Sequence, residues 1–236
     1  MDARMLRELE LANVVALYEA RATPTVPGAP PTRDPSREAQ QVASGPVRDV
    51  ANLDWDALKD TVRGCTACGL CKQRKQAVFG VGNESAPWLF VGEGPGAEED
   101  ERGEPFVGQA GKLLDRMLAA IGVARGREAY IANVVKCRPP GNRTPSAEES
   151  ASCAPFLDRQ IELLRPRLIV ALGKTAALRL LGTEASLASL RGKVHDYRGT
   201  PLVVTYHPAY LLRSLPEKAK AWEDLLFARK TMAGAA

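Results

Sequence analysis

The chain has 236 residues, of which 45% are hydrophobic and 25% charged, and its formal net charge is +4. These proportions are typical of a globular protein with one domain and an appendage. No apolar run approaches the ~20 residues of a membrane-spanning helix, and the charged N-terminus lacks a signal-cleavage pattern, so we expect a cytoplasmic protein with no membrane association. The mildly basic charge permits nucleic-acid binding without requiring it.

The N-terminal part of the chain differs in composition from the rest. Residues 1–21 place apolar side chains at three- and four-residue steps, which predicts an amphipathic helix. Residues 22–47 contain six prolines and few large apolar residues, which predicts a disordered linker. The helix is either an unimportant extension or a docking element for a partner protein. Residues 48–236 are expected to form one domain, and the protein is expected to be a monomer.

From residue 54 onward, apolar runs alternate with helical patterns. Short apolar runs predict four strands, at 88–91, 129–132, 167–172 and 201–206. Amphipathic patterns at 111–121 and 147–164 predict helices between them. Strands separated by helices are typical of βαβ units. We therefore predict an α/β fold, a single α/β/α domain around a mainly parallel four-stranded central sheet.

Polar residues follow each predicted strand. Glu93, Asn133, Lys174 and His207 come just after the four apolar runs. Because ligands of open parallel sheets bind beyond the carboxyl ends of the strands, these side chains are expected to share one site. The glycines at 92–96 lack the spacing and the acidic partner of a dinucleotide site, and the segment before Lys174 lacks the first glycine of a phosphate loop.

The five cysteines favour a bound metal or cluster over disulfides, since their number is odd and no secretory signal is visible. Cys65 and Cys68 form a C-x2-C pair that Cys71 extends, while Cys137 and Cys153 lie far downstream. Four thiolates suit either structural zinc or an iron–sulfur cluster, and the spacing does not separate the two. Alternatively, the two distant cysteines are small buried hydrophobic residues.

Seven short motifs follow one another in order between residues 55 and 226. They are C-x2-C at 65–68, VFGVG at 78–82, GEGPG at 92–96, PFVG at 105–108, NVVKCRPP at 133–140, ALG at 171–173 and YHPAYLL at 206–212. Together they resemble the family-four uracil-DNA glycosylases, the iron–sulfur branch of that superfamily. The resemblance implies a DNA-repair hydrolase that acts on uracil-containing DNA, single- or double-stranded, breaks the bond between uracil and deoxyribose, and leaves an abasic site.

The resemblance also implies the cofactor. It assigns a 4Fe–4S cluster to four thiolates, those of Cys65, Cys68, Cys137 and Cys153. Cys71 falls outside the family motif and is expected to be a bystander, unless it replaces one of the ligands. The cluster is expected to be structural.

Asn133 suits uracil recognition, because its amide oxygen accepts from uracil N3–H while its NH2 group donates to O4. Cytosine presents the opposite pattern, so it would leave a buried Asn unpaired. The resemblance assigns Phe106 to stacking on the flipped base and Glu99 to a position near uracil C5 that excludes the thymine methyl group. The ordinary alternatives are a turn-capping Asn, a core Phe and a solvated helix start.

The resemblance assigns two residues to the chemical step. His207 hydrogen-bonds uracil O2, where negative charge develops as the bond breaks. Glu93 is the candidate for positioning the attacking water or supporting the cationic sugar, since other branches of the superfamily place Asp or Asn in this loop for that work. Gly94 lets the main chain of the loop approach the base. The other histidine, His195, is expected to be structural.

DNA contacts are expected around this site. The segment 208–213 is expected to enter the minor groove with Tyr210, Leu211 or Leu212 as a wedge. The expected phosphate contacts are Lys136, Arg138, Arg143, Lys174 and Arg213. A solvated basic face is the ordinary alternative for each of them. Segment 138–145 contains no His, so we predict turnover rather than the covalent adduct that one related branch forms.

Three other functions remain open at this point. The first is a non-catalytic iron–sulfur module that binds DNA or associates with a polymerase, and the second is a zinc-stabilised nucleotide-binding protein. The third is a glycosylase with a broader choice of damaged bases, such as hypoxanthine.

Overall fold

A computed structural model describes residues 50–234, so the N-terminal helix expected at 1–21 and the linker expected at 22–47 lie outside the described residues. Its helices are α3 (Trp55–Arg63), η1 (Gly69–Lys72), α4 (Ala97–Arg102), α5 (Gln109–Ala120), η2 (Pro140–Asn142), α6 (Ala147–Leu164), α7 (Lys174–Leu181), α8 (Leu187–Leu190), α9 (Pro208–Leu211) and α10 (Glu217–Gly234). Its strands are β1 (Val81–Gly82), β2 (Trp88–Gly92), β3 (Ala129–Asn133), β4 (Leu168–Leu172), β5 (Val194–Tyr197) and β6 (Thr200–Thr205). None of the helices described is long and apolar enough to cross a membrane.

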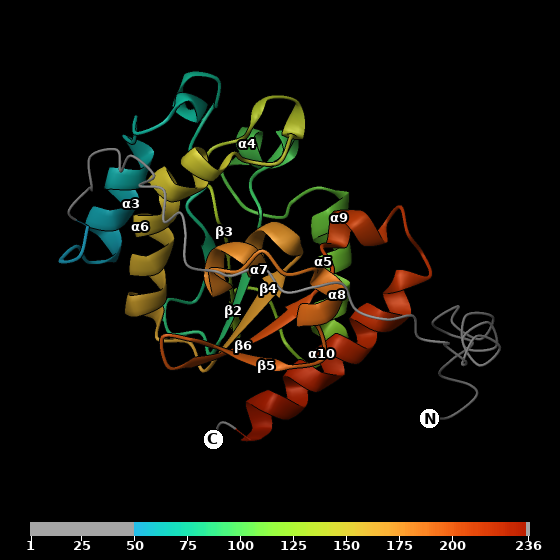
Figure 1. The fold of residues 1–236 in the computed structure, drawn as a ribbon. Helices are drawn as coiled ribbons and strands as arrows, with labels where there is room; N and C mark the ends of the chain where they lie inside the picture. Colours follow the sequence, from blue (N-terminus) through green and yellow to red (C-terminus); the bar gives the residue numbers. More distant parts are fainter. Residues whose placement is uncertain (1–49, 235–236) are drawn as a thin grey trace, which may run out of the picture. The chain divides into compact units, whose positions relative to one another are not determined.

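The sheet has six strands in the order β1-β3-β2-β4-β6-β5 (Figure 1). The four central strands are parallel and are those that the apolar runs predict, but the predicted total of four strands is wrong. Antiparallel β1 and β5 form the edges. Neither carries an apolar run, because β1 has two residues and β5 buries only Tyr197.

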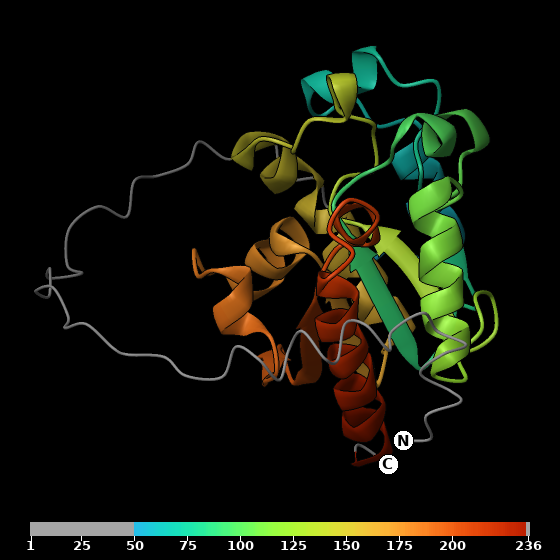
Figure 2. The same ribbon diagram turned by 90° about the vertical axis from the view of Figure 1, so that its right-hand side faces the viewer.

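Helices cover both faces of the sheet, which confirms the α/β/α prediction. On one face, alternate strand residues such as Leu89 and Val91 form a core with α3, α6 and α7. On the other face, Trp88 and Phe90 form a core with α5 and α10, which lie on the same side of the sheet in Figure 2. The central strands are buried throughout, as parallel strands between two helical layers must be.

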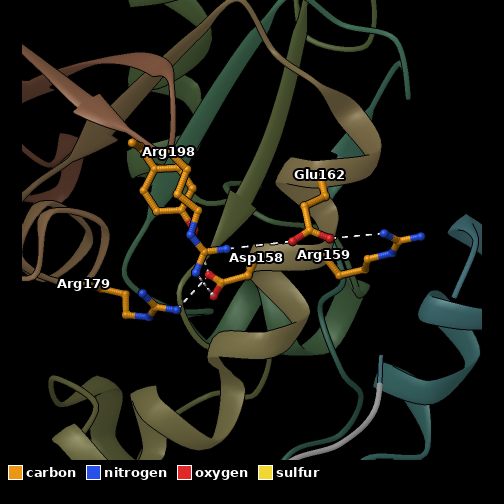
Figure 3. A network of polar contacts seen from close by, with 6 residues as sticks. Asp158, Arg159, Glu162, Arg179 and Arg198 are labelled. Carbon is orange, nitrogen blue, oxygen red and sulfur yellow. Dashed lines mark hydrogen bonds and ion pairs between the residues drawn. The ribbon is translucent and has the colours of Figure 1, made fainter. Parts of the chain in front are cut away.

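Asp158 joins α6 to α7 and to the β5–β6 hairpin (Figure 3). Its Oδ1 atom accepts hydrogen bonds from Arg179 at 2.8 Å and from the Tyr197 hydroxyl at 2.9 Å. Its Oδ2 atom accepts from Arg198 at 3.1 Å. One carboxylate therefore links α6 to the hairpin and to α7, the helix that follows β4 at the centre of the sheet.

The order of the strands also determines where a ligand can bind. The chain passes from β2 to β3 on one side of β2, then crosses to β4 on the other side. The connections therefore diverge between β2 and β4, which leaves a crevice at the carboxyl ends of these strands.

Candidate active site

A cleft of about 1160 Å³ opens at the carboxyl ends of the parallel strands. Its walls are the segments that follow β2, β3, β4 and β6. All six residues predicted for catalysis or base binding line this cleft: Glu93, Gly94, Glu99, Phe106, Asn133 and His207. The prediction that the polar residues after the strands meet at one edge of the sheet is therefore confirmed.

Asn133 is the last residue of β3 and is 1% exposed. Its Oδ1 atom is buried and has no hydrogen-bond partner in the part of the chain that the structure describes. A buried carbonyl oxygen left unpaired costs about 1–3 kcal/mol, so such an atom in the wall of a cleft is suited to a donor on a ligand.

Gly92 leaves room for the Asn133 side chain. The two residues are paired in register in the parallel ladder between β2 and β3, so substituents on them point the same way. A methyl group at Gly92 would lie 2.5 Å from Asn133 Oδ1 and 2.5 Å from Phe106 Cζ. Only a glycine at this position lets the amide and the ring share the cleft wall.

Phe106 has a φ of 55°, in the left-handed region that non-glycine residues seldom adopt. Arg125 stabilises this backbone by donating to the carbonyl oxygens of Pro105 and Phe106, each at 2.8 Å. The ring is 5.5 Å from the His207 ring and is tilted by 32° to it. Sequence analysis missed Arg125, because no motif marks an arginine whose partners are main-chain oxygens.

Glu99 accepts hydrogen bonds from three backbone N–H groups. Oε2 accepts from Gly96 at 3.1 Å, and Oε1 accepts from Val107 at 2.9 Å and Gly108 at 3.1 Å. The carboxylate therefore joins the GEGPG loop to the loop that carries Phe106. Exclusion of the thymine methyl group by Glu99 stays a prediction.

His207 is arranged as a neutral hydrogen-bond donor. Its Nδ1 atom accepts from Ala209 N at 3.2 Å, which leaves the proton of a neutral ring on Nε2. Burial, assisted by the positive charge of Arg213, lowers the pKa of His207 to about 4, although Glu99 opposes the shift. Gly173 permits the close approach of this residue, since a methyl group there would lie 2.8 Å from His207 Cβ.

Glu93 begins the loop after β2, and its carboxylate Oε2 accepts a hydrogen bond from Thr175 Oγ1. Thr175 is the second residue of α7 and also lines the cleft. The sequence offered one indirect signal for Thr175, its place just after a predicted strand.

All five cysteines line a second, small apolar cavity between the C-x2-C segment and α6. Cys65, Cys68, Cys137 and Cys153 are therefore brought together as predicted, and Cys71 lies with them. In residues 50–234, no three His, Cys, Asp or Glu side chains approach closely enough to share a single metal ion.

Donors to sulfur surround this cavity. Arg74 donates to Cys137 Sγ at 2.8 Å, and Lys136 N donates to Cys153 Sγ at 3.3 Å. Burial raises the pKa of the Cys137 thiol. Burial also raises the pKa of the Cys153 thiol, to about 12. Buried thiolates here therefore need a bound cation or cluster to be stable. N–H groups and a guanidinium aimed at sulfur are suited to the excess negative charge of a thiolate-bound cluster.

Two of the predicted DNA contacts are wrong. Lys136 is 1% exposed, and its Nζ donates to Asn133 O at 2.9 Å and to Gln160 Oε1 at 2.6 Å. It cannot reach a phosphate, and burial lowers its pKa to about 8. Leu211 is 1% exposed, on the short helix α9 that packs against α5, so the exposed wedge candidates are Tyr210 and Leu212.

The other predicted cations lie at or beside the cleft. Lys174 and Arg213 are exposed and line it. Arg143 lines it too but pairs with Glu149 at 2.7 Å. Arg138 donates to Asn142, another residue of the wall. Their contacts with DNA stay predictions, whereas the structural interpretation of His195 is supported by its hydrogen bond to Leu190 O at 2.7 Å.

Comparison with known proteins identifies a matching family and several relatives. The model of the uracil DNA glycosylase superfamily matches residues 79–226. A type-4 uracil-DNA glycosylase of Thermotoga maritima is 48% identical over 161 residues, which are 67% of this chain and 83% of the relative. Type-4 uracil-DNA glycosylases of Pyrobaculum aerophilum and Archaeoglobus fulgidus are 44% identical over 181 residues and 46% identical over 168 residues. Those alignments cover 73% and 66% of this chain, and 92% and 84% of the relatives.

Proposed function

The chain belongs to the type-4 branch of the uracil-DNA glycosylase superfamily, and we propose that it hydrolyses the N-glycosidic bond between uracil and deoxyribose in DNA, leaving an abasic site for repair. The observation in the site that carries this proposal is the unpaired, buried Oδ1 atom of Asn133 beside Phe106 and His207. A uracil base supplies the donor that this oxygen lacks, at N3.

Access to the base requires the nucleotide to leave the DNA stack, which costs a few kcal/mol. In the cleft, uracil stacks on Phe106 and pairs with Asn133 through N3–H and O4. Cytosine has an acceptor at N3 and a donor at position 4, so it would leave the Asn133 amide unpaired. Losses of this kind support discrimination of about 10⁴-fold or more.

Bond cleavage leaves negative charge on uracil and positive charge on the sugar. His207 donates from Nε2 to uracil O2, and because the ring is neutral it stabilises the anion without transferring a proton. One pre-aimed donor of this type contributes about 3–4 kcal/mol at the transition state. Glu93 positions the attacking water, and its negative charge favours the cationic sugar.

The four thiolates of Cys65, Cys68, Cys137 and Cys153 are proposed to hold a 4Fe–4S cluster. Support comes from the shared apolar cavity and from the donors to sulfur. The cluster would supply a cross-link rather than a reactive group, since it would connect the C-x2-C segment to α6 and to the residues after β3. Iron and sulfide analysis tests it: Cys137→Ser should lose the cluster, and Cys71→Ser should keep it.

The partner is uracil-containing DNA, bound along the rim that carries Arg143, Lys174 and Arg213. Tyr210 and Leu212, 40% and 42% exposed, are proposed to fill the space that the flipped base leaves. The protein is proposed to act as a monomer.

The test is excision from an oligonucleotide with one uracil, followed by alkali to break the strand at abasic sites. Wild type should break the strand, whereas Asn133→Ala and His207→Ala should be strongly impaired. A folded, cluster-containing wild type that leaves the strand intact would overturn the proposal and favour the non-catalytic DNA-binding module. Excision of hypoxanthine at a similar rate would favour the broader glycosylase.

A further inference from the structure

Glu93 is held by neighbours on both sides. On the β3 side, its main-chain carbonyl accepts a hydrogen bond from Val135 N at 3.2 Å, which continues the ladder beyond the strand ends. On the β4 side, its carboxylate Oε2 accepts from Thr175 Oγ1. Within residues 50–234, no other group donates a hydrogen bond to this carboxylate and no cation pairs with it. Its Oε1 atom is therefore left for a ligand or a water molecule.

The contact between Glu93 and Thr175 crosses the point where the chain connections diverge. Strands β2 and β4 are parallel neighbours, with Val91 opposite Ala171, so both chains leave the sheet at the same level. Helix α7 begins right after β4 and places Thr175 on its second residue. The Thr side chain is branched at Cβ, which restricts its χ1 angle and keeps the hydroxyl in place.

We propose that Thr175 is a positioning residue for uracil excision. Its hydroxyl holds the Glu93 carboxylate in the conformation in which Oε1 binds the attacking water. This inference rests on the proposed function and on the role given there to Glu93. A glutamate has several rotatable bonds, and an unrestrained side chain would spend much of its time in other rotamers.

A neutral donor suits this task better than a cation. Lys174 precedes Thr175 and is exposed, and Arg179 pairs with Asp158, so neither of these cations neutralises Glu93. A hydroxyl orients the carboxylate and leaves its negative charge intact. That charge then remains available to the cationic sugar and to the water.

The test compares single-turnover excision by the full chain with its cluster, using the uracil oligonucleotide at saturating protein. Thr175→Val has nearly the same shape but lacks the hydroxyl, and it should lower the excision rate by about 10- to 100-fold, as expected for one hydrogen bond to a charged group. Affinity for uracil-containing DNA should change less than about threefold. Thr175→Ser restores a hydroxyl and should recover most of the rate.

A double-mutant cycle separates positioning from a general effect. In a Glu93→Ala background, Thr175→Val should cause no further loss, because the group that it positions is gone. Thr231→Val is the matched control, since its hydroxyl bonds Phe227 O on α10, outside the cleft. This control should leave rate, melting temperature and cluster absorbance unchanged.

The possible results are distinguishable. A wild type without excision overturns the proposed function. With an active wild type, an unimpaired Thr175→Val, or an equal loss from Thr175→Val with and without Glu93, overturns the role of Thr175 alone. An unimpaired Glu93→Ala overturns the roles of both Glu93 and Thr175, while uracil excision itself stands.

Discussion

Replacing Gly92 with alanine should close the base-binding site without unfolding the protein. Gly92 ends β2 with a backbone conformation that other residues adopt, since its φ lies outside the positive region. Replacing a glycine at a compatible position stabilises a protein by about 0.4–1 kcal/mol through the unfolded chain. The cost of the added methyl group therefore arises from what it contacts.

The contacts of this methyl group are with the groups proposed to hold uracil. It would lie 2.5 Å from Asn133 Oδ1 and 2.5–2.6 Å from two carbons of the Phe106 ring. Ordinary van der Waals contact is about 3.5 Å or more, so each must move by about 1 Å. A displacement of that size at a reacting centre costs about 100-fold in rate. We expect Gly92→Ala to lower uracil excision by 100-fold or more.

The assay is single-turnover excision, run beside thermal unfolding and the cluster absorbance of the same samples. Gly234→Ala is the matched control, because a methyl group there meets nothing within 4 Å. The melting temperature of Gly92→Ala should stay within a few degrees of wild type, since the ring and the amide border the cleft and can move into it. A wild-type excision rate for Gly92→Ala would refute the assignment of Asn133 and Phe106 as the pair that holds the base.

Four further predictions follow from individual side chains. The pKa of His207 falls from 6.5 to about 4 on folding, so the unfolded chain takes up a proton at this residue first as the pH drops. Wild type should therefore lose about 2–3 kcal/mol of stability between pH 6.5 and 4, and His207→Gln should not show this loss. The pH profile of the wild-type excision rate should show no inflection near pH 6.5. An inflection there that is absent from His207→Gln would contradict the interpretation of His207 as a neutral hydrogen-bond donor. Lys136→Met leaves two buried acceptors unpaired and should cost about 2–5 kcal/mol in chemical denaturation, while the salt dependence of DNA binding stays unchanged. Arg213→Ala should instead reduce by about one the slope of the logarithm of the DNA-binding constant against the logarithm of the salt concentration, at unchanged stability. A reduced slope for Lys136→Met would contradict the burial of Lys136. Asp158→Ala removes the acceptor of three donors and should lower the free energy of unfolding by about 1–2 kcal/mol. The more exposed control Glu162→Ala should lower it by about 0–1 kcal/mol. Equal losses would show that the network of Asp158 contributes nothing beyond surface pairing.

The sequence predicted the central part of the fold because that part depends on hydrophobic pattern. Four short apolar runs alternating with helical patterns favour parallel strands between two helical layers, and polar residues after such strands meet at one edge of the sheet. The edge strands β1 and β5 were not predicted, because neither carries such an apolar run. Strand β5 reads VHDY and exposes most of its side chains, and it is held by pairing with β6 through a tight turn at Arg198 and Gly199, both with positive φ.

The errors within the site have a common cause. The sequence shows that Lys136 is a cation among other cations, but not that the chain after β3 turns its side chain inward. Leu211 was one of three candidates for an exposed wedge, and only the helical turn of α9 decides which of them is buried. Arg125 and Thr175 were missed because their partners lie 10 or more residues away, with nothing in the intervening sequence to mark the contact.

The segment from Asn133 to Cys137 connects the two cavities of the protein. The Asn133 amide lies in the wall of the cleft, while Cys137 lines the cavity of the cysteines. Between them, Lys136 donates from its backbone to Cys153 Sγ and from its ammonium group to the carbonyl of Asn133. A shift of the cysteines would therefore move the residue that supports Asn133 in its place. The proposed cluster would then contribute to base recognition, since it would fix the backbone that carries the amide proposed to read uracil.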